Sequence, residues 1–199
     1  MELVRDQLGL ARPFATAHAC YLLVEAADAV DPTGSGCSRG ALERVADVAV
    51  ALDGPRRAQL WRYREDHTEA LNLIGPPHKL DVTLPLPALA AFLADVPAVV
   101  RAVAPKARTW LFGHAGDGNI HVNVTGVDCN DLALGDAVDG AVLALAADRN
   151  GSISAEHGIG TAKRRWLHLN RTPAELAAMA AIKAALDPHR ILNPNCLLP

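Results

Sequence analysis

The segment FGHAGDGNIHVNV (residues 112–124) constrains the fold of this chain more than any other part of the sequence. Its centre, Gly116-Asp117-Gly118, is typical of the tight bend of a β-hairpin, and strand-forming residues stand on both sides of it. We therefore predict an antiparallel pair of strands with TWLFGHAG and NIHVNVTG as its two arms.

The rest of the chain alternates between strand-like and helix-like segments. A short apolar run at 20–28 and an alternating, β-branched run at 79–86 are predicted as strands. Interleaving of this kind with an antiparallel pair indicates an α+β fold around one sheet. Helices are predicted over residues 41–75 with a break at Gly54-Pro55, over 87–104, over 131–151 with Gly151 as C-terminal cap, and over 172–188 with Thr172, Pro173 and Glu175 in the first turn.

Size and composition fit one globular domain of 199 residues with a formal net charge of −3, which does not favour binding to nucleic acid. The four cysteines are scattered without a CxxC motif, which is typical of reduced thiols in the cytoplasm. The charged start, with Pro13, does not resemble a signal peptide, and no apolar run suggests a membrane span. We expect a cytoplasmic domain.

The hairpin contains residue types that can bind metals. His121 and Asn123 are two positions apart and so share one face of a strand, while His114 lies on the opposite arm close to the bend. Two imidazoles on facing strands supply two of the three protein ligands of a catalytic metal site. For Asp117 we favour a role in the turn, with a role as ligand or as partner of a ligand left open.

A second motif, SAEHGIG at residues 154–160, offers a candidate third metal ligand and a candidate base. Glu156 supplies a carboxylate as third ligand. His157 is the residue type best suited to act as a base near neutral pH. Neighbouring residues of an extended segment point to opposite faces, which favours separate roles for these two.

Cationic residues earlier in the chain suggest an anion site. Arg64 and Thr68 are four apart on a predicted helix and hence on one face, and Lys79 follows. A guanidinium beside a hydroxyl can bind a carboxylate. A small anionic substrate near a metal and a histidine base is therefore predicted, although a solvated surface is the alternative for Arg64 and Lys79.

Five segments, in this order, resemble the C-terminal domain of FAD-linked oxidases of the vanillyl-alcohol-oxidase type, in the branch of D-lactate, glycolate and D-2-hydroxyglutarate dehydrogenases. They are LWRYRED, KLDVTLPL, FGHAGDGNIHVNV, GSISAEHGIGTAK and LDPHRILNPN. The resemblance implies a ferredoxin-like antiparallel sheet with helices on one face, covering residues 1–199.

The resemblance also implies roles for matching residues in the oxidation of a D-2-hydroxy acid to its 2-oxo acid. By this resemblance, His114, His121 and Glu156 would hold a metal, with zinc the favoured ion, and His157 would be the base. The substrate would be bound by Arg64, Thr68, Lys79 and Asn123, and Asn193 would lie near the flavin.

The chain departs from the family in two places. Nothing resembles an FAD-binding domain, since the Gly34-Ser35-Gly36 loop is too short and follows no GxGxxG pattern. We therefore expect FAD to be held mainly by a domain or subunit outside this chain, without which the chain has no dehydrogenase activity. Asn195-Cys196 also replaces the glycine and basic residue usual after the final Asn-Pro.

Other functions are left open by the residues. A stand-alone hydrolase would use the same ion to activate water. A binding module would keep the pocket without the chemistry, and a sister flavin activity such as ether-lipid synthesis is a further alternative. The electron acceptor and the oligomeric state, including a homodimer, are not specified by any motif.

Overall fold

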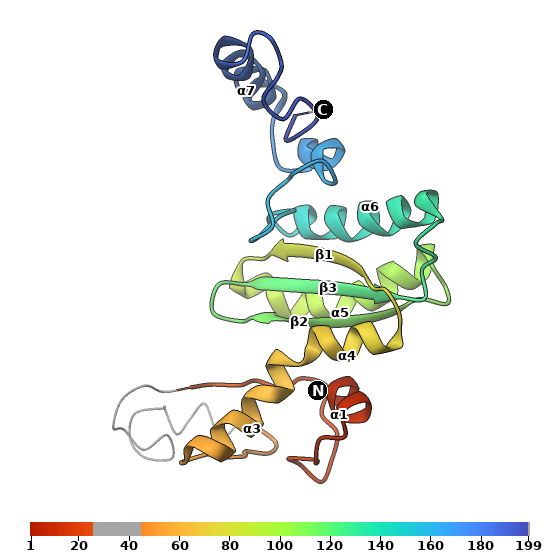
Figure 1. Cartoon of the computed structure of the whole chain (residues 1–199), viewed down its shortest axis with the longest axis vertical. Helices are drawn as coiled ribbons and strands as arrows, with labels where there is room; N and C mark the ends of the chain where they lie inside the picture. Colours follow the sequence, from red (N-terminus) through yellow and green to blue (C-terminus); the bar gives the residue numbers. More distant parts are fainter. Residues whose placement is uncertain (26–44, 199) are drawn as a thin grey trace. The chain divides into compact units, whose positions relative to one another are not determined.

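The computed structural model describes residues 1–25 and 45–198. The chain forms two compact units, Met1–Gly75 and Pro76–Pro199. Figure 1 shows the helices and strands of both units.

The first unit is helical in its described residues, with α1 (Glu2–Leu8), α3 (Gly54–Glu65) and α4 (His67–Ile74). Asp53 caps α3, because its side chain accepts a hydrogen bond from the Arg56 amide at 2.8 Å. The helix predicted over 41–75 therefore begins only at Gly54, and residues 45–53 are not helical. Asp66 separates α3 from α4, so the predicted second helix is interrupted there.

The strand predicted at 20–28 is wrong for its described part. Residues 20–25 take no regular structure, and residues 26–28 lie outside the described part of the chain. The side chains of Leu22 and Val24 are exposed, at 74% and 66%. A single apolar run becomes a strand only where a neighbouring strand pairs with its backbone, and the described residues of the first unit include no strand.

The second unit contains the sheet, built from β1 (His78–Thr83), β2 (Arg108–His114) and β3 (Asn119–Thr125). The strands are antiparallel in the order β1-β3-β2, with β3 in the middle (Figure 1). Helix α5 (Leu86–Val103) connects β1 to β2, and α6 (Leu132–Asp148) follows β3. This β-α-β-β-α order is that of a ferredoxin-like fold. The fourth strand is represented by a single bridge, Thr83 to Ser152, at the free side of β1.

The core lies on one face of the sheet. Alternate strand residues, such as Val82 and Val122, point to that face and are fully buried with Phe92 of α5 and Val142 of α6. Both helices pack here, as expected for an α+β fold with helices on one face, and the opposite face is left for polar side chains.

Helix α5 is long and apolar enough to cross a membrane. Length and composition alone are weak evidence for a membrane span, because core helices can meet the same two conditions. Its Phe92, Val96 and Val100 are fully buried in the core of the second unit, which favours a core helix.

The two predicted caps of the later helices have different outcomes. The Thr172 capping box is confirmed, with Thr172 and Glu175 each bonding the other's backbone amide at the start of α7 (Pro173–Leu186). The cap at Gly151 is wrong, because Asn150 takes the left-handed conformation at φ 58°. Gly151 instead approaches β1, where a Cβ atom would lie 2.6 Å from the Thr83 carbonyl oxygen.

Helix α7 buries none of its residues. The segment after it is held by Asp187, which accepts hydrogen bonds from the amides of Ile191 and Leu192 and from Lys183. Further on, the Leu197 amide bonds the Gly160 carbonyl at 2.9 Å. Cys20, Cys129 and Cys196 are free thiols, and Cys37 lies outside the described residues.

Candidate functional site

The candidate site lies on the face of the sheet opposite the core, which we call the polar face. Three rows of directly opposed residues form it, one residue from each strand per row. His121 of β3 is at the centre of the middle row. The rows are Lys79–Asn123–Trp110, Asp81–His121–Phe112 and Thr83–Asn119–His114.

The hairpin is confirmed, and two glycines fix its shape. A Cβ atom on Gly113 would lie 2.0 Å from the Asn119 carbonyl oxygen, and one on Gly118 would lie 2.0 Å from that of Leu84. Gly118 also has φ +73°. The Asp117 side chain accepts a hydrogen bond from the Asn119 amide at 3.0 Å, which supports its role in the turn.

Two other imidazoles lie near His121. Its ring centroid lies 6.4 Å from that of His114 and 5.9 Å from that of His157. His114 in turn faces Glu156, with 3.7 Å between Nδ1 and Oε1. The structure therefore brings together the four residues that the sequence singles out as ligands and base.

Asp81 connects the sheet to the segment that carries Glu156 and His157. Its Oδ2 accepts hydrogen bonds from the backbone amides of residues 155–157 at 2.8 to 3.0 Å. Its Oδ1 lies 3.5 Å from His121 Nδ1 and has no hydrogen-bond partner among the described residues. Asp81 is fully buried.

Charge on Asp81 is favoured despite this burial. Burial alone raises the pKa of its carboxyl, but the amide donors of His157 and Glu156, with nearby positive charge, outweigh it and lower the pKa. Lys163 donates from Nζ to the Asp81 carbonyl oxygen at 2.8 Å, and burial lowers the pKa of this lysine.

One group of three residues fits a divalent ion by the spacing of its ligand atoms, and the predicted ligand set shares one residue with it. Asp81, His121 and His157 each place a ligand atom within 4.8 Å of the others. The predicted set of His114, His121 and Glu156 shares His121 with this group, and its His114–Glu156 separation is 3.7 Å. Imidazole and carboxylate groups of the kinds present in both groups are ligands suited to zinc or a similar ion.

The predicted substrate residues are divided between the two units. Lys79 is exposed and directly opposes Asn123, whose amide nitrogen is buried without a hydrogen-bond partner among the described residues. Arg64 and Thr68 belong to the first unit, on α3 and α4, and their role stays a prediction.

Asn193, predicted near the flavin, lies in the segment after α7 and has φ 45°. Its carbonyl accepts from the Cys196 amide at 3.1 Å, just before Leu197 bonds Gly160. The predicted cofactor residue is thereby tied to the same segment that carries His157.

Sequence reasoning missed Asp81 and Asn119. Both are buried on the polar face, and both amide atoms of Asn119 have no hydrogen-bond partner among the described residues. The alternation of KLDVTL already places residues 79, 81 and 83 on one face. Recognising Asp81 as a neighbour of His121 would have required the register between β1 and β3.

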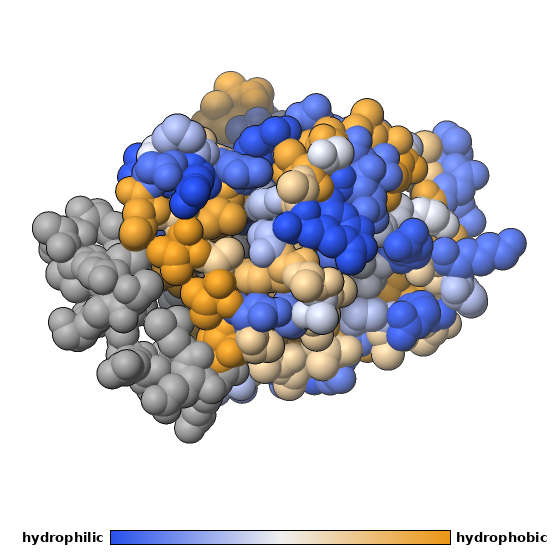
Figure 2. Space-filling view, turned by 90° about the horizontal axis from the view of Figure 1, so that it is seen from below, coloured by the Kyte–Doolittle hydropathy of each residue, from blue (hydrophilic) through white to orange (hydrophobic). Residues whose placement is uncertain are grey.

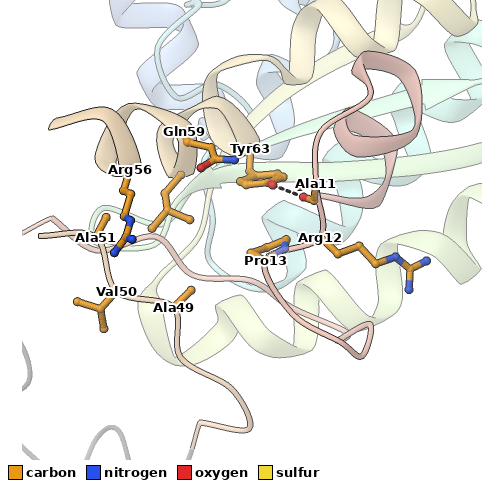
Figure 3. A pocket seen from close by; sticks show the side chains of 10 residues that line it. Ala11, Arg12, Pro13, Ala49, Val50, Ala51, Arg56, Gln59 and Tyr63 are labelled. Atoms are coloured by element: carbon orange, nitrogen blue, oxygen red, sulfur yellow. Dashed lines mark hydrogen bonds between the residues drawn. The ribbon is translucent and has the colours of Figure 1, made fainter. Parts of the chain in front are cut away.

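The first unit has a separate hollow, lined by α3 residues and by residues 11–13 and 49–51 (Figure 3). Tyr63 donates a hydrogen bond to the Ala11 carbonyl there, and the Arg12 side chain extends away from Tyr63. No carboxylate or imidazole is among the lining residues, so this hollow offers no ligand set like that of the polar face.

One face of the molecule, drawn in Figure 2, shows hydrophobic side chains interrupting a largely hydrophilic surface. The described residues include exposed apolar side chains in both units, such as Leu52 and Leu186 at 79% and 77%.

The chain is similar to a known protein family and to several known proteins. The model of the family described as FAD linked oxidases, C-terminal domain, matches residues 1–197. A D-2-hydroxyglutarate dehydrogenase of Xanthomonas citri pv. viticola is 40% identical over 95% of this chain and 42% of its own length. The mitochondrial D-2-hydroxyglutarate dehydrogenases of Bos taurus and Arabidopsis thaliana are 38% and 34% identical over 100% of this chain, and 37% and 36% of their own lengths.

This chain thus spans less than half the length of these relatives. The family match covers nearly every residue, and it includes the hairpin and the SAEHGIG segment, whose histidines lie close together at the polar face. The chain belongs to the FAD-linked oxidase family, as a C-terminal domain of that family.

Proposed function

We propose that this chain is the substrate- and metal-binding part of a flavin-dependent dehydrogenase that oxidises a D-2-hydroxy acid, with D-2-hydroxyglutarate as the favoured substrate. The observation that carries the proposal is the meeting of His114, His121, Glu156 and His157 on one face of the sheet. The names of the similar proteins support this choice of substrate.

His114, His121 and Glu156 would hold the ion, with zinc as the favoured metal because imidazole and carboxylate ligands suit it. When bound, the ion supplies Lewis acidity that lowers the pKa of the substrate hydroxyl. The exposure of the His114 and Glu156 side chains, 49% and 54%, leaves room for substrate on this side of the site.

His157 would accept the hydroxyl proton on an imidazole nitrogen while the hydride leaves carbon 2 for the flavin. The proton and the hydride together account for the two hydrogens lost when the alcohol becomes a ketone. Because the His157 amide is fixed by Asp81, the backbone that carries the base is held in place.

Lys79 and Asn123 would bind a substrate carboxylate one row away from His121. An ammonium group and an amide nitrogen supply donors of the kind a carboxylate accepts. Arg64 and Thr68, on α3 and α4 of the first unit, remain predicted carboxylate-binding residues of the substrate site.

The test joins this chain to the FAD-binding part of one of its relatives and follows flavin bleaching without oxygen. D-2-hydroxyglutarate should bleach the flavin and its L enantiomer should not. His168→Asn serves as the matched histidine control, because His168 lies on η1 (Arg164–Leu169), away from the site motifs in sequence. A flavin that no D-2-hydroxy acid reduces would contradict the proposal, and ester hydrolysis without flavin would favour a hydrolase.

A further inference from the structure

We infer that Asp81 is a positioning residue of this site, which holds the segment of Glu156 and His157 with one carboxylate oxygen and orients His121 with the other. It is not itself a metal ligand. This inference rests on the proposed function, because it explains how the residues assigned there as ligands and base are kept in place.

The first step concerns Oδ2 of Asp81. Three consecutive amides, those of residues 155–157, donate to this one atom at 3.0, 2.8 and 3.0 Å. Converging amides of this kind form a site for an anion. A cation at Oδ2 would have to displace these donors, so this oxygen is better explained as the anchor of the segment than as a ligand.

The second step concerns Oδ1. It is buried and lacks a hydrogen bond among the described residues, and His121 Nδ1 lies 3.5 Å away in the directly opposed position of β3. A ring movement of about half an ångström would bring the two atoms within hydrogen-bond distance. A histidine that donates from Nδ1 to a carboxylate presents Nε2 to a metal, which is the usual arrangement around metal-bound histidines.

Burial separates Asp81 from the residues assigned as ligands. Its side chain is 0% exposed and that of His121 is 17% exposed, whereas His114 and Glu156 are about half exposed. An ion that must also contact substrate needs an open coordination position. The half-exposed side chains of His114 and Glu156 leave space for such a position, whereas the Asp81 carboxylate is enclosed.

Lys163 strengthens the role of Asp81 as an anchor. Its Nζ donates to the backbone carbonyl oxygen of Asp81 at 2.8 Å. The segment from 155 to 163 is therefore attached at both ends to the same residue of β1. Loss of the Asp81 carboxylate should loosen the end that carries Glu156 and His157.

The experiment compares Asp81→Asn with Asp139→Asn in the full chain. Asp139 of α6 also pairs with a histidine of β1, His78, with 2.6 Å between Oδ1 and Nε2, so it controls for the loss of an aspartate–histidine contact. Zinc affinity is measured by competition with a chelator. Asp81→Asn should weaken zinc binding about 10- to 100-fold with the chain still folded, and Asp139→Asn should leave the affinity unchanged.

Two results would overturn the inference. Unchanged zinc affinity in Asp81→Asn would show that the carboxylate does not act on the site. A loss as complete as that in His121→Ala, with the fold intact, would show that Asp81 is a direct ligand.

A second measurement needs no variant and no metal. Nitrogen-15 NMR of the wild-type chain, at a pH where imidazoles are neutral, distinguishes the two tautomers of His121. A proton on Nδ1 is expected, and a proton on Nε2 would overturn the inference even if Asp81→Asn fails to fold. A wild-type chain that binds no zinc would contradict the proposed function, whereas the tautomer tests the Asp81 contact separately.

Discussion

His114 and Glu156 meet with 3.7 Å between the imidazole Nδ1 and the carboxylate Oε1, although one ends a strand and the other belongs to an irregular segment beyond α6. Two ligands bonded at 2.0–2.2 Å to a tetrahedral ion lie roughly 3.4 Å apart. The observed separation is therefore close to that of two ligands of one zinc ion.

The bend of the hairpin gives the first prediction. Gly118→Ala should lower the free energy of unfolding by about 3 kcal/mol or more, because the residue has φ +73° and the new Cβ would meet the Leu84 carbonyl oxygen at 2.0 Å. Gly116→Ala is the matched control, since no atom lies within 4 Å of a Cβ at that position. Equal stability of the two variants in urea unfolding would contradict this account.

The second prediction concerns pH and the first unit. Burial lowers the pKa of His67 from 6.5 to about 4, so the unfolded chain binds more protons than the folded chain between these values. The neutral His67 should therefore make its full contribution to the free energy of unfolding of this unit above pH 6.5. This contribution should be lost as the pH falls toward 4.

Urea unfolding at about pH 5 and about pH 7, on either side of the ordinary histidine pKa, measures this change in stability. His67→Gln should show a smaller change between the two conditions than the wild type. The control is His168→Gln in the second unit, which should respond like the wild type. A His67→Gln variant with the full pH response would show that this histidine is not the group responsible.

Helix α7 gives the third prediction, because it buries none of its own residues and so depends on local interactions. Thr172→Ala removes the capping box and should cost about 1 kcal/mol of helix stability. Faster amide exchange confined to α7 is the expected readout, with Thr161→Ala, outside this helix, as the control. Unchanged exchange in α7 would mean that other contacts hold the helix.

His157 gives the fourth prediction, which separates a base from a ligand. With the FAD-binding part supplied, His157→Asn should slow flavin reduction about 10²- to 10⁴-fold. Its zinc content should stay at the wild-type level, because the proposed ligands are His114, His121 and Glu156. Loss of zinc from this variant would instead favour the Asp81–His121–His157 group as the binding set.

Much of the second unit could be predicted from sequence because its signals are local. The hairpin depends on Gly116-Asp117-Gly118, and the start of α7 depends on Thr172 and Glu175, all of them close in sequence. The strand predicted at 20–28 had no such local support. The described residues of the first unit offer its apolar residues no strand to pair with, and residues 20–25 take no regular structure.

The candidate residues could be singled out from the sequence, but their arrangement could not. Motif chemistry singled out His114, His121, Glu156 and His157, which the structure brings together. Asp81 was missed because its role depends on two long-range facts, the register of β1 against β3 and the approach of residues 155–157. Neither leaves a local pattern in the sequence.

The central claim is that the polar face binds a divalent ion through His114, His121 and Glu156. The most direct test is the metal content of the purified chain by elemental mass spectrometry, with His121→Ala and Glu156→Gln beside the wild type. Glu175→Gln, in the first turn of α7, is the control for loss of a carboxylate. About one divalent ion per chain in the wild type and the control, lost from both site variants, is the predicted result. A wild-type chain without the ion, even after incubation with zinc and a 2-hydroxy acid, would contradict the claim.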